Sequence, residues 1–170
     1  MSVASAGEDR LRTLIDNFTP DVGAYLRRRS YPLEDADVEE LVQSVFVVAW
    51  RRIDDVPAGA ELPWLIGVAR NVLSNARRSH SRRRALLSRI LPSRDDPSAE
   101  DLVTASEDLK RAFGCLSRSD REILLLHFWE GLEAANLAVV LGIRQGAAST
   151  RLSRASARLR ANFELAVTTR

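Results

Sequence analysis

The chain has 170 residues, a formal net charge of +2 and an apolar fraction of 45%. This composition is sufficient to bury one core or two small ones, and it excludes a chain that is disordered throughout. A single cysteine, Cys115, excludes an internal disulfide and a cysteine-based zinc site.

The first residues contain no apolar segment of the kind that a signal peptide requires, and no uncharged run approaches the length of a membrane span. We therefore expect a cytoplasmic protein without membrane insertion. We expect Cys115 to be a small buried apolar residue.

The charged residues are segregated along the chain. No acidic residue lies between Arg70 and Arg94, a stretch that contains eight arginines. After Glu133 the only acidic residue is Glu164. Two basic zones separated by acidic stretches are typical of a chain that contacts a polyanion at two places.

Helical periodicity recurs along the chain, whereas alternating strand patterns do not. We expect an all-α fold of two small helical domains, 1–90 and 105–168, joined by a flexible linker at 91–104. The segment LPSRDDPSAED in this linker combines two prolines with four acids and two serines, a composition that cannot supply a packed core. The predicted helices cover 8–30, 37–53, 61–84 with an extension to 90 left open, 100–115, 118–130, 134–141 and 145–166.

The predicted helix 37–53 begins with a candidate capping box, Asp37 to Glu40, and carries a wide apolar stripe. Two interpretations of the stripe stay open. The helix forms part of a small buried three-helix core, or it binds a partner with Glu40, Gln43 and part of its apolar surface turned outward.

The predicted helix 61–84 has two different faces. Apolar residues recur at core spacing on one, and the other collects arginines and asparagines that lack acids four residues away to pair with. A solvated face is the simple interpretation, and a membrane surface is disfavoured because only small residues follow Leu73 on the apolar side. An aromatic ring, amides and arginines together suit an unpaired nucleic-acid strand. The candidate residues are Trp64, Arg70, Asn71, Asn75, Arg77 and Arg78.

Residues 133–160 have the pattern of a helix-turn-helix. Ala138 is small where two helices would cross, Gly142 suits a positive φ in the turn, and Ile143 fills the junction. Short polar side chains and arginines at the start of the second helix can enter the major groove of duplex DNA. The candidate contacts are Arg144, Gln145, Ser149, Thr150, Arg151, Arg154 and Arg158.

Two other classes of protein are weighed against a chain that handles both single strands and duplex. The first is a stand-alone two-domain helix-turn-helix regulator, which is disfavoured because it gives no role to the arginines beside Trp64 and Asn71. An enzyme is disfavoured because the sequence has no glycine-rich phosphate loop, paired metal ligands or nucleophile motif. We expect no catalytic residue, cofactor or metal, and we expect His80 and His127 to face solvent or to serve structure.

Several motifs resemble those of the extracytoplasmic-function (ECF, group IV) sigma factors of bacterial RNA polymerase, in the sigma-70 family. DADVEELVQSVFVVAWRRIDD is similar to family segment 2.2, and LPWLIGVARNVLSNARR resembles segments 2.3 and 2.4. The stretch from LSRSDREILLLHFWEG to RASARLR resembles region 4. The resemblance spans about residues 11–165, with the linker in the expected place.

The resemblance implies a role for each part. The 37–53 helix would bind the clamp helices of the largest polymerase subunit, and region 4 would bind the flap of the second-largest subunit. Trp64 and Asn71 match positions near the flipped base of the minus-10 element, with Asn71 in a loop or helix start, and the second helix of region 4 would recognise the minus-35 element. An anti-sigma factor is a further possible partner. The residues at matching positions on the 37–53 helix are Glu40, Leu41, Gln43 and Phe46.

The sequence departs from the family pattern at several positions. Ser44 replaces a common acid, and Asn75 a common aspartate. Ala147 replaces a threonine, which would remove an N-cap hydroxyl worth roughly 1 kcal/mol. The other departures in region 4 are Ala134, Asn136 and Ala148.

Overall fold

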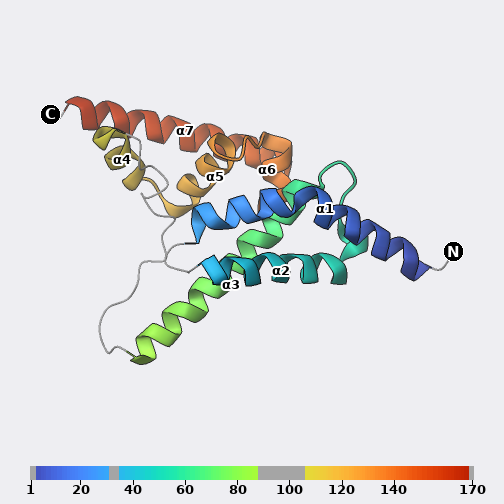
Figure 1. Ribbon diagram of the computed structural model, residues 1–170. Coiled ribbons are helices and arrows are strands. Elements are labelled where there is room, and N and C mark those ends of the chain that lie inside the picture. The colour runs from blue at the N-terminus through green and yellow to red at the C-terminus, as the bar shows by residue number, and fades with distance from the viewer. Residues whose placement is uncertain (1–2, 31–34, 88–105, 169–170) are drawn as a thin grey trace. The chain divides into compact units, whose positions relative to one another are not determined.

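The computed structural model describes residues 3–30, 35–87 and 106–168. This described part consists of α-helices and one short 3-10 helix, with no strand, so the all-α expectation is confirmed (Figure 1). None of its helices is long and apolar enough to cross a bilayer. Contacts divide the chain into two compact units, Met1–Asp95 and Asp96–Arg170. The predicted linker 91–104 lies outside the described residues.

Unit 1 is a bundle of three helices, α1 (Val3–Arg29), α2 (Asp35–Arg51) and α3 (Glu61–Leu87), with the 3-10 helix η1 (Ile53–Asp55) between the last two. Each long helix packs against the other two, because each carries an apolar stripe at helical spacing. The fully or nearly fully buried side chains of this core are Leu14, Val22, Tyr25, Leu26, Val38, Val45, Ala49, Val56, Leu65, Ile66, Ala69 and Leu73.

Unit 2 is built around its last helix. The helix α7 (Gln145–Thr168) packs against α4 (Glu107–Gly114), α5 (Arg118–Phe128) and α6 (Ala134–Leu141). Serine side chains cap the first two helices: Ser106 Oγ accepts from Leu109 N at 3.3 Å, and Ser117 Oγ accepts from Asp120 N at 3.1 Å. The best-buried core side chains are Ala112, Ile123, Leu124, Leu125, Leu126, Leu137, Ala148 and Ala155.

Several predicted helix ends were wrong by a few residues. The helix predicted at 37–53 begins at Asp35, so Asp37 lies inside the first turn and the predicted capping box is wrong. It ends at Arg51, because the chain changes there to the tighter η1 turn. The helix predicted at 100–115 begins at Glu107 in the described part, directly after its Ser106 cap.

Two expectations about single residues were also wrong. Cys115 is exposed, because it lies in the turn that follows α4 instead of on the helix face that packs on α7. The helix α7 begins at Gln145, and Ala148 N donates to Arg144 O at 3.0 Å. Ala147 therefore lies within the first turn, and the absence of a threonine there does not remove an N-cap.

Candidate nucleic-acid interface

One side of α3 forms an exposed polar stripe. Asn71, Asn75, Arg78 and Arg82 are exposed and follow one another at spacings of four, three and four residues, which places them along one helix face. Trp64 lies seven residues before Asn71, about two turns earlier on the same face, and is half-buried. We call these five residues the α3 stripe. The opposite face is buried in the core of unit 1 through Leu65, Ile66, Ala69 and Leu73.

Two contacts orient side chains in the α3 stripe. Arg78 Nη2 donates to Asn75 Oδ1 at 2.6 Å, so the guanidinium is held beside the amide. The Arg52 guanidinium carbon lies 5.5 Å from the centroid of the Trp64 ring, within the range of a cation–π interaction. These contacts reduce the rotamer freedom that a ligand would otherwise have to restrict.

The other predicted arginines of α3 are less exposed. Arg77 Nη2 donates to Arg29 O, the last carbonyl of α1, and this contact ties the two helices together. Arg70 is half-buried. Of the three arginines predicted to hold a strand, only Arg78 lies in the α3 stripe.

Asn71 lies in the middle of α3, ten residues after its first residue. The expectation of a loop or helix start at this position is wrong. The helix continues through it because Val68, Ala69, Val72 and Leu73 keep core spacing on the buried side. Only the side chain of Asn71 is thus available for recognition, since its backbone groups belong to the helix.

The turn before α3 is fixed by a carboxylate. Glu61 Oε1 accepts from Gly59 N at 3.0 Å, and Gly59 adopts a left-handed φ of 78°. The pKa of Glu61 is lowered, first by this backbone hydrogen bond and then by one from its own N–H, while slight burial opposes the shift and the charge of Arg10 adds to it. A carboxylate in the first turn also matches the helix dipole. This turn sets where Trp64 enters α3.

The helix-turn-helix geometry in unit 2 is confirmed. Gly142 has a φ of 64°, Ile143 N donates to Ala138 O at 3.0 Å, and Gly142 N donates to Val139 O at 3.3 Å. This pair of bonds is the Schellman arrangement that ends α6 and redirects the chain into α7. Ala138 is buried where the helices approach each other.

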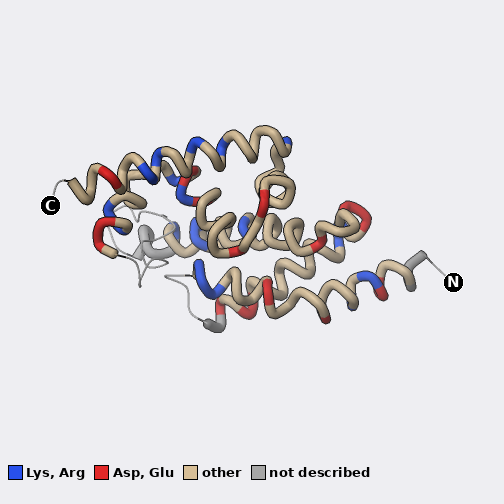
Figure 2. The backbone as a smooth tube through the Cα atoms, turned by 90° about the horizontal axis from the view of Figure 1, so that it is seen from above, with Lys and Arg blue, Asp and Glu red and all other residues tan. Residues whose placement is uncertain are grey.

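The predicted duplex contacts on α7 separate into two groups. Basic residues recur along this helix with one acidic residue near its C-terminal end (Figure 2). Arg151 Nη2 donates to Ser119 O at 3.1 Å, and Arg158 Nη1 donates to both carboxylate oxygens of Asp120 at 3.1 and 2.9 Å. These two arginines therefore bind α5. The residues of the predicted set that are exposed without such a tie to α5 are Arg144, Gln145, Ser149, Thr150 and Arg154.

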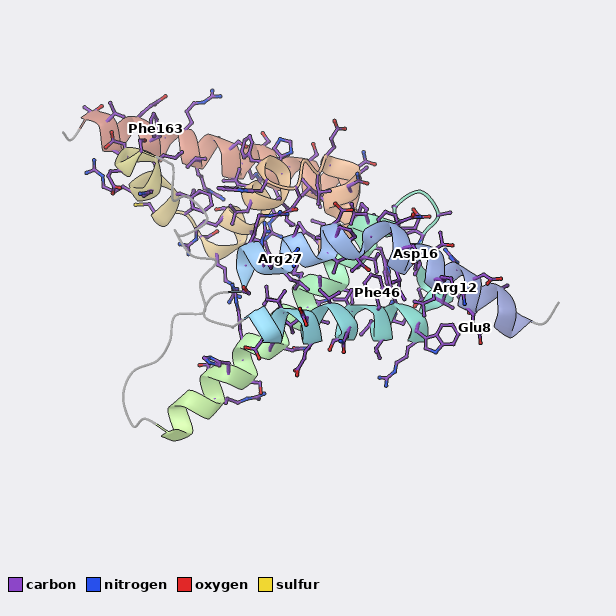
Figure 3. The ribbon with its side chains drawn as sticks, viewed as in Figure 1. Glu8, Arg12, Asp16, Arg27, Phe46 and Phe163 are labelled. Carbon is purple, nitrogen blue, oxygen red and sulfur yellow. The ribbon has the colours of Figure 1, made fainter. Side chains whose placement is uncertain are left out.

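A third surface is an open groove of about 750 Å³ between α1 and α2. Three large apolar side chains in its lining are unusually exposed: Ile15 at 38%, Val47 at 48% and Trp50 at 43%. Figure 3 shows Phe46 on α2 beside α1, with Glu8, Arg12 and Asp16 along α1. We call this surface the α1/α2 groove.

The predicted polymerase-binding residues of α2 occupy different environments. Glu40 and Gln43 are exposed, and Gln43 lines the α1/α2 groove. Leu41 and Phe46 are each only 8% exposed and belong mainly to the core of unit 1, although Phe46 also lines the groove. The predicted polymerase-binding residues did not include Ile15, which also lines the groove. Its spacing of four residues from Leu11, which places both on one helix face, was the available sequence signal.

The structure bears on a possible metal site and on the role of His127. The described residues contain no cluster of three His, Cys, Asp or Glu side chains that could hold a metal ion. His127 Nδ1 lies 2.8 Å from Leu132 O, a contact that joins the end of α5 to the following loop. His127 thus serves structure, as expected.

Comparison with known families identifies the chain. Residues 14–83 match the model of sigma-70 region 2, and residues 106–159 match the model of sigma-70 region 4. The chain belongs to the sigma-70 family. It is 31% identical over 176 residues to the ECF RNA polymerase sigma factor SigL of Mycobacterium tuberculosis, covering 99% of this chain and 98% of SigL. It is thus an ECF sigma factor of RNA polymerase.

Further relatives agree with this assignment. RNA polymerase sigma factor NccH of Alcaligenes xylosoxydans is 30% identical over 142 residues, or 78% of this ECF sigma factor and 76% of NccH. The solved structure of CnrH with the cytosolic domain of CnrY has a TM-score of 0.54 and 25% identity, covering 91% of this chain and 88% of that one. The sigma factor RpoE, in a complex from Bartonella quintana, shares the fold with a TM-score of 0.55 at 23% identity.

These findings favour the ECF sigma factor over the stand-alone regulator. The relatives are sigma factors, which are regulatory subunits and not enzymes. Unit 1 contains the region 2 match and unit 2 the region 4 match.

Proposed function

We propose that this ECF sigma factor directs core RNA polymerase to a two-part promoter and nucleates melting by capturing unpaired bases of the minus-10 element. The observation that carries the proposal is the α3 stripe, where an indole ring, two amides and two arginines lie along one helix face. These groups match what an unpaired strand offers: a ring face, a base edge and a phosphate backbone.

The energies of base capture support this mechanism. Extruding a base from duplex DNA costs a few kcal/mol, and less where pairing is weak. Stacking on an aromatic side chain returns about 1–3 kcal/mol per base. Binding to Trp64, with hydrogen bonds from Asn71 and Asn75 and a phosphate contact from Arg78, therefore shifts the melting equilibrium without ATP.

For the minus-35 element we propose the exposed N-terminal part of α7. Gln145, Ser149 and Thr150 lie in its first two turns, where the second helix of a helix-turn-helix contacts base edges. Arg144 and Arg154 lie on either side of them and would contact phosphates. Arg151 and Arg158 were also predicted for this interface, but their ties to α5 give them a different part in it.

Core polymerase would bind through α2 and the α1/α2 groove. Ile15, Val47 and Trp50 expose apolar surface whose burial would favour association, and Glu40 and Gln43 add polar specificity. The partner that the family resemblance indicates is the clamp of the largest subunit, with the flap of the second-largest subunit for unit 2. The chain would bind polymerase in the cytoplasm.

An anti-sigma factor is the second partner that we propose. The solved structures of RpoE and CnrH hold the anti-sigma factor NepR and the cytosolic domain of CnrY, respectively. A protein that covered the α1/α2 groove would compete with polymerase for the same apolar residues. The inhibited and active forms would then be mutually exclusive.

The test is transcription by core enzyme with and without this chain, from templates with every base at each minus-10 position. Asn71→Ala should lower discrimination at one position by about tenfold, the value of a lost amide contact, and leave core affinity unchanged. Asn17→Ala is the matched control, because Asn17 is exposed on α1 outside the α3 stripe. If transcription does not depend on the chain, the proposed function is contradicted. If Asn71→Ala discriminates between bases as well as the wild type does, Asn71 has no part in minus-10 recognition.

A further inference from the structure

The helix α7 is tied to the first turn of α5 at two points. Arg158 Nη1 donates to Asp120 Oδ1 at 3.1 Å and Oδ2 at 2.9 Å, and Arg151 Nη2 donates to Ser119 O at 3.1 Å. The two arginines are seven residues apart, so they project from the same side of α7 about two turns from each other. Both acceptors are adjacent residues at the start of α5.

Asp120 is the buried charged residue among the described ones, with 4% of its surface exposed. A buried carboxylate is costly unless it is paired and hydrogen-bonded, so its position demands a cation. Its own backbone is fixed, because Asp120 N donates to Ser117 Oγ at 3.1 Å in the α5 cap. The buried carboxylate is therefore held at the start of α5, and Arg158, whose side chain is 58% exposed, reaches it from α7.

The apolar contact of α7 gives little rotational definition. Ala148 and Ala155 are fully buried and also seven residues apart, so the closest side of α7 presents methyl groups. Leu152 and Leu159 beside them are only half-buried. A contact formed by small residues permits close approach but resists rotation and sliding less than one in which large side chains interdigitate. The arginine ties to α5, together with the hydrogen bond from Asn162 Nδ2 to Ala112 O at 3.1 Å on α4, fix this rotation.

We infer that Asp120 is a positioning residue for promoter recognition: through Arg158, and together with the Ser119–Arg151 tie, it sets the rotation of α7 that presents Gln145, Ser149 and Thr150 to base edges. Asp120 itself does not contact DNA. Arg158 is a structural tie and not a phosphate contact. The inference rests on the proposed use of α7 at the minus-35 element.

The direction in which DNA affinity changes when the Asp120 charge is removed distinguishes a positioning role from simple charge repulsion. Removing an acid near a DNA-binding surface ordinarily strengthens binding, because it removes repulsion of the phosphates. Here Asp120→Asn should weaken specific binding by about tenfold, because it releases Arg158 and α7 is then no longer held in the rotation that presents its polar side chains to the bases. If Arg158 instead contacted a phosphate, Asp120→Asn would free it and binding would tighten.

The experiment uses the full chain in complex with core polymerase and a duplex enriched by the wild-type complex from a random pool. Affinity is measured for this duplex and for a scrambled duplex of equal composition, across a salt series. Asp120→Asn, Arg158→Gln and the double variant should each lower the ratio of specific to scrambled affinity by a similar factor, because they break the same tie. The slope of log affinity against log salt should not change, whereas loss of a phosphate contact lowers its magnitude by about one.

Two controls separate positioning from folding and from charge. Circular dichroism at the assay temperature establishes that each variant is folded, and Asp120→Glu, which keeps the acceptor, should recover most of the ratio. Glu107→Gln makes the same charge change at an exposed residue of α4, whose carboxylate is paired with Lys110, and should leave the ratio unchanged.

The outcomes separate a failure of the proposed function from a failure of the Asp120 positioning role. If the wild-type complex enriches no duplex, the proposed function fails and this inference fails with it. If it enriches one and Asp120→Asn binds it equally or more tightly, or if Arg158→Gln lowers the salt slope by about one, the positioning role alone is overturned.

Discussion

Arg52 covers one face of the Trp64 ring, with its guanidinium carbon 5.5 Å from the ring centroid. Arg52 is itself held by Asp55, to which its Nε donates at 2.9 Å. In the function proposed above, a base would therefore stack on Trp64 from the face that Arg52 does not cover. The arrangement holds the indole before any nucleic acid binds.

Trp64→Ala should reduce formation of the open complex by about tenfold or more, because stacking contributes about 1–3 kcal/mol per base. Fluorescence of 2-aminopurine placed in the minus-10 element measures this step. Trp64→Phe retains an aromatic face and should keep most of the signal. Equal opening by Trp64→Ala would show that the ring serves only the core of unit 1.

The lowered pKa of Glu61 predicts a pH dependence of unit 1 stability. A carboxylate whose pKa is lower in the folded state stabilises above its unfolded value, near 4.5, and this stabilisation is lost as the pH falls through the folded pKa. Glu61→Gln should lower the free energy of unfolding by about 0.5 kcal/mol at pH 7, a small value because the site is near solvent. Urea unfolding at pH 7 and pH 3 measures the difference, which should be smaller at pH 3 because Glu61 is then protonated to a greater extent. A difference of equal size at both values would contradict the assigned role.

Val47→Glu should weaken binding to core polymerase by at least about tenfold, since it places a charge in the α1/α2 groove at an apolar contact. Val47 is 48% exposed, so the free energy of unfolding should change by less than about 0.5 kcal/mol. Fluorescence anisotropy of the labelled chain with core enzyme measures the affinity. Asn17→Glu adds the same charge on α1 outside the groove lining and should bind normally; equal weakening by both variants would point to long-range charge instead of the groove.

Two glycines of the helix-turn-helix should respond to alanine with opposite signs. Gly142 has a φ of 64° and open space around it, so Gly142→Ala should destabilise unit 2 by about 1 kcal/mol through backbone strain alone. Gly146 lies in the first turn of α7, also with open space, and Gly146→Ala should stabilise by about 0.5–1 kcal/mol. Thermal unfolding compares the two variants, and destabilisation by both would contradict this account of the turn.

The sequence by itself determined the all-helical class, the helix-turn-helix and the existence of a polar face on α3. Each depends on interactions between residues close in the chain. The spacing of Leu65, Ala69 and Leu73 specifies which side of α3 is buried, and the position of Gly142 after Ala138 specifies the turn. Family resemblance then supplied the expected partners.

Only the tertiary structure decided which members of each polar or apolar set are available to a partner. The sequence does not distinguish three arginines from the exposed Arg78 and Arg154, but their guanidinium groups bind the protein itself. Arg77 binds Arg29 O, Arg151 binds Ser119 O and Arg158 binds the Asp120 carboxylate. Likewise Leu41 is buried while Val47, from the same helix, is exposed in a groove that α1 completes. The physical reason is that these partners lie 32 to 48 residues away in the chain, so helical periodicity carries no information about them.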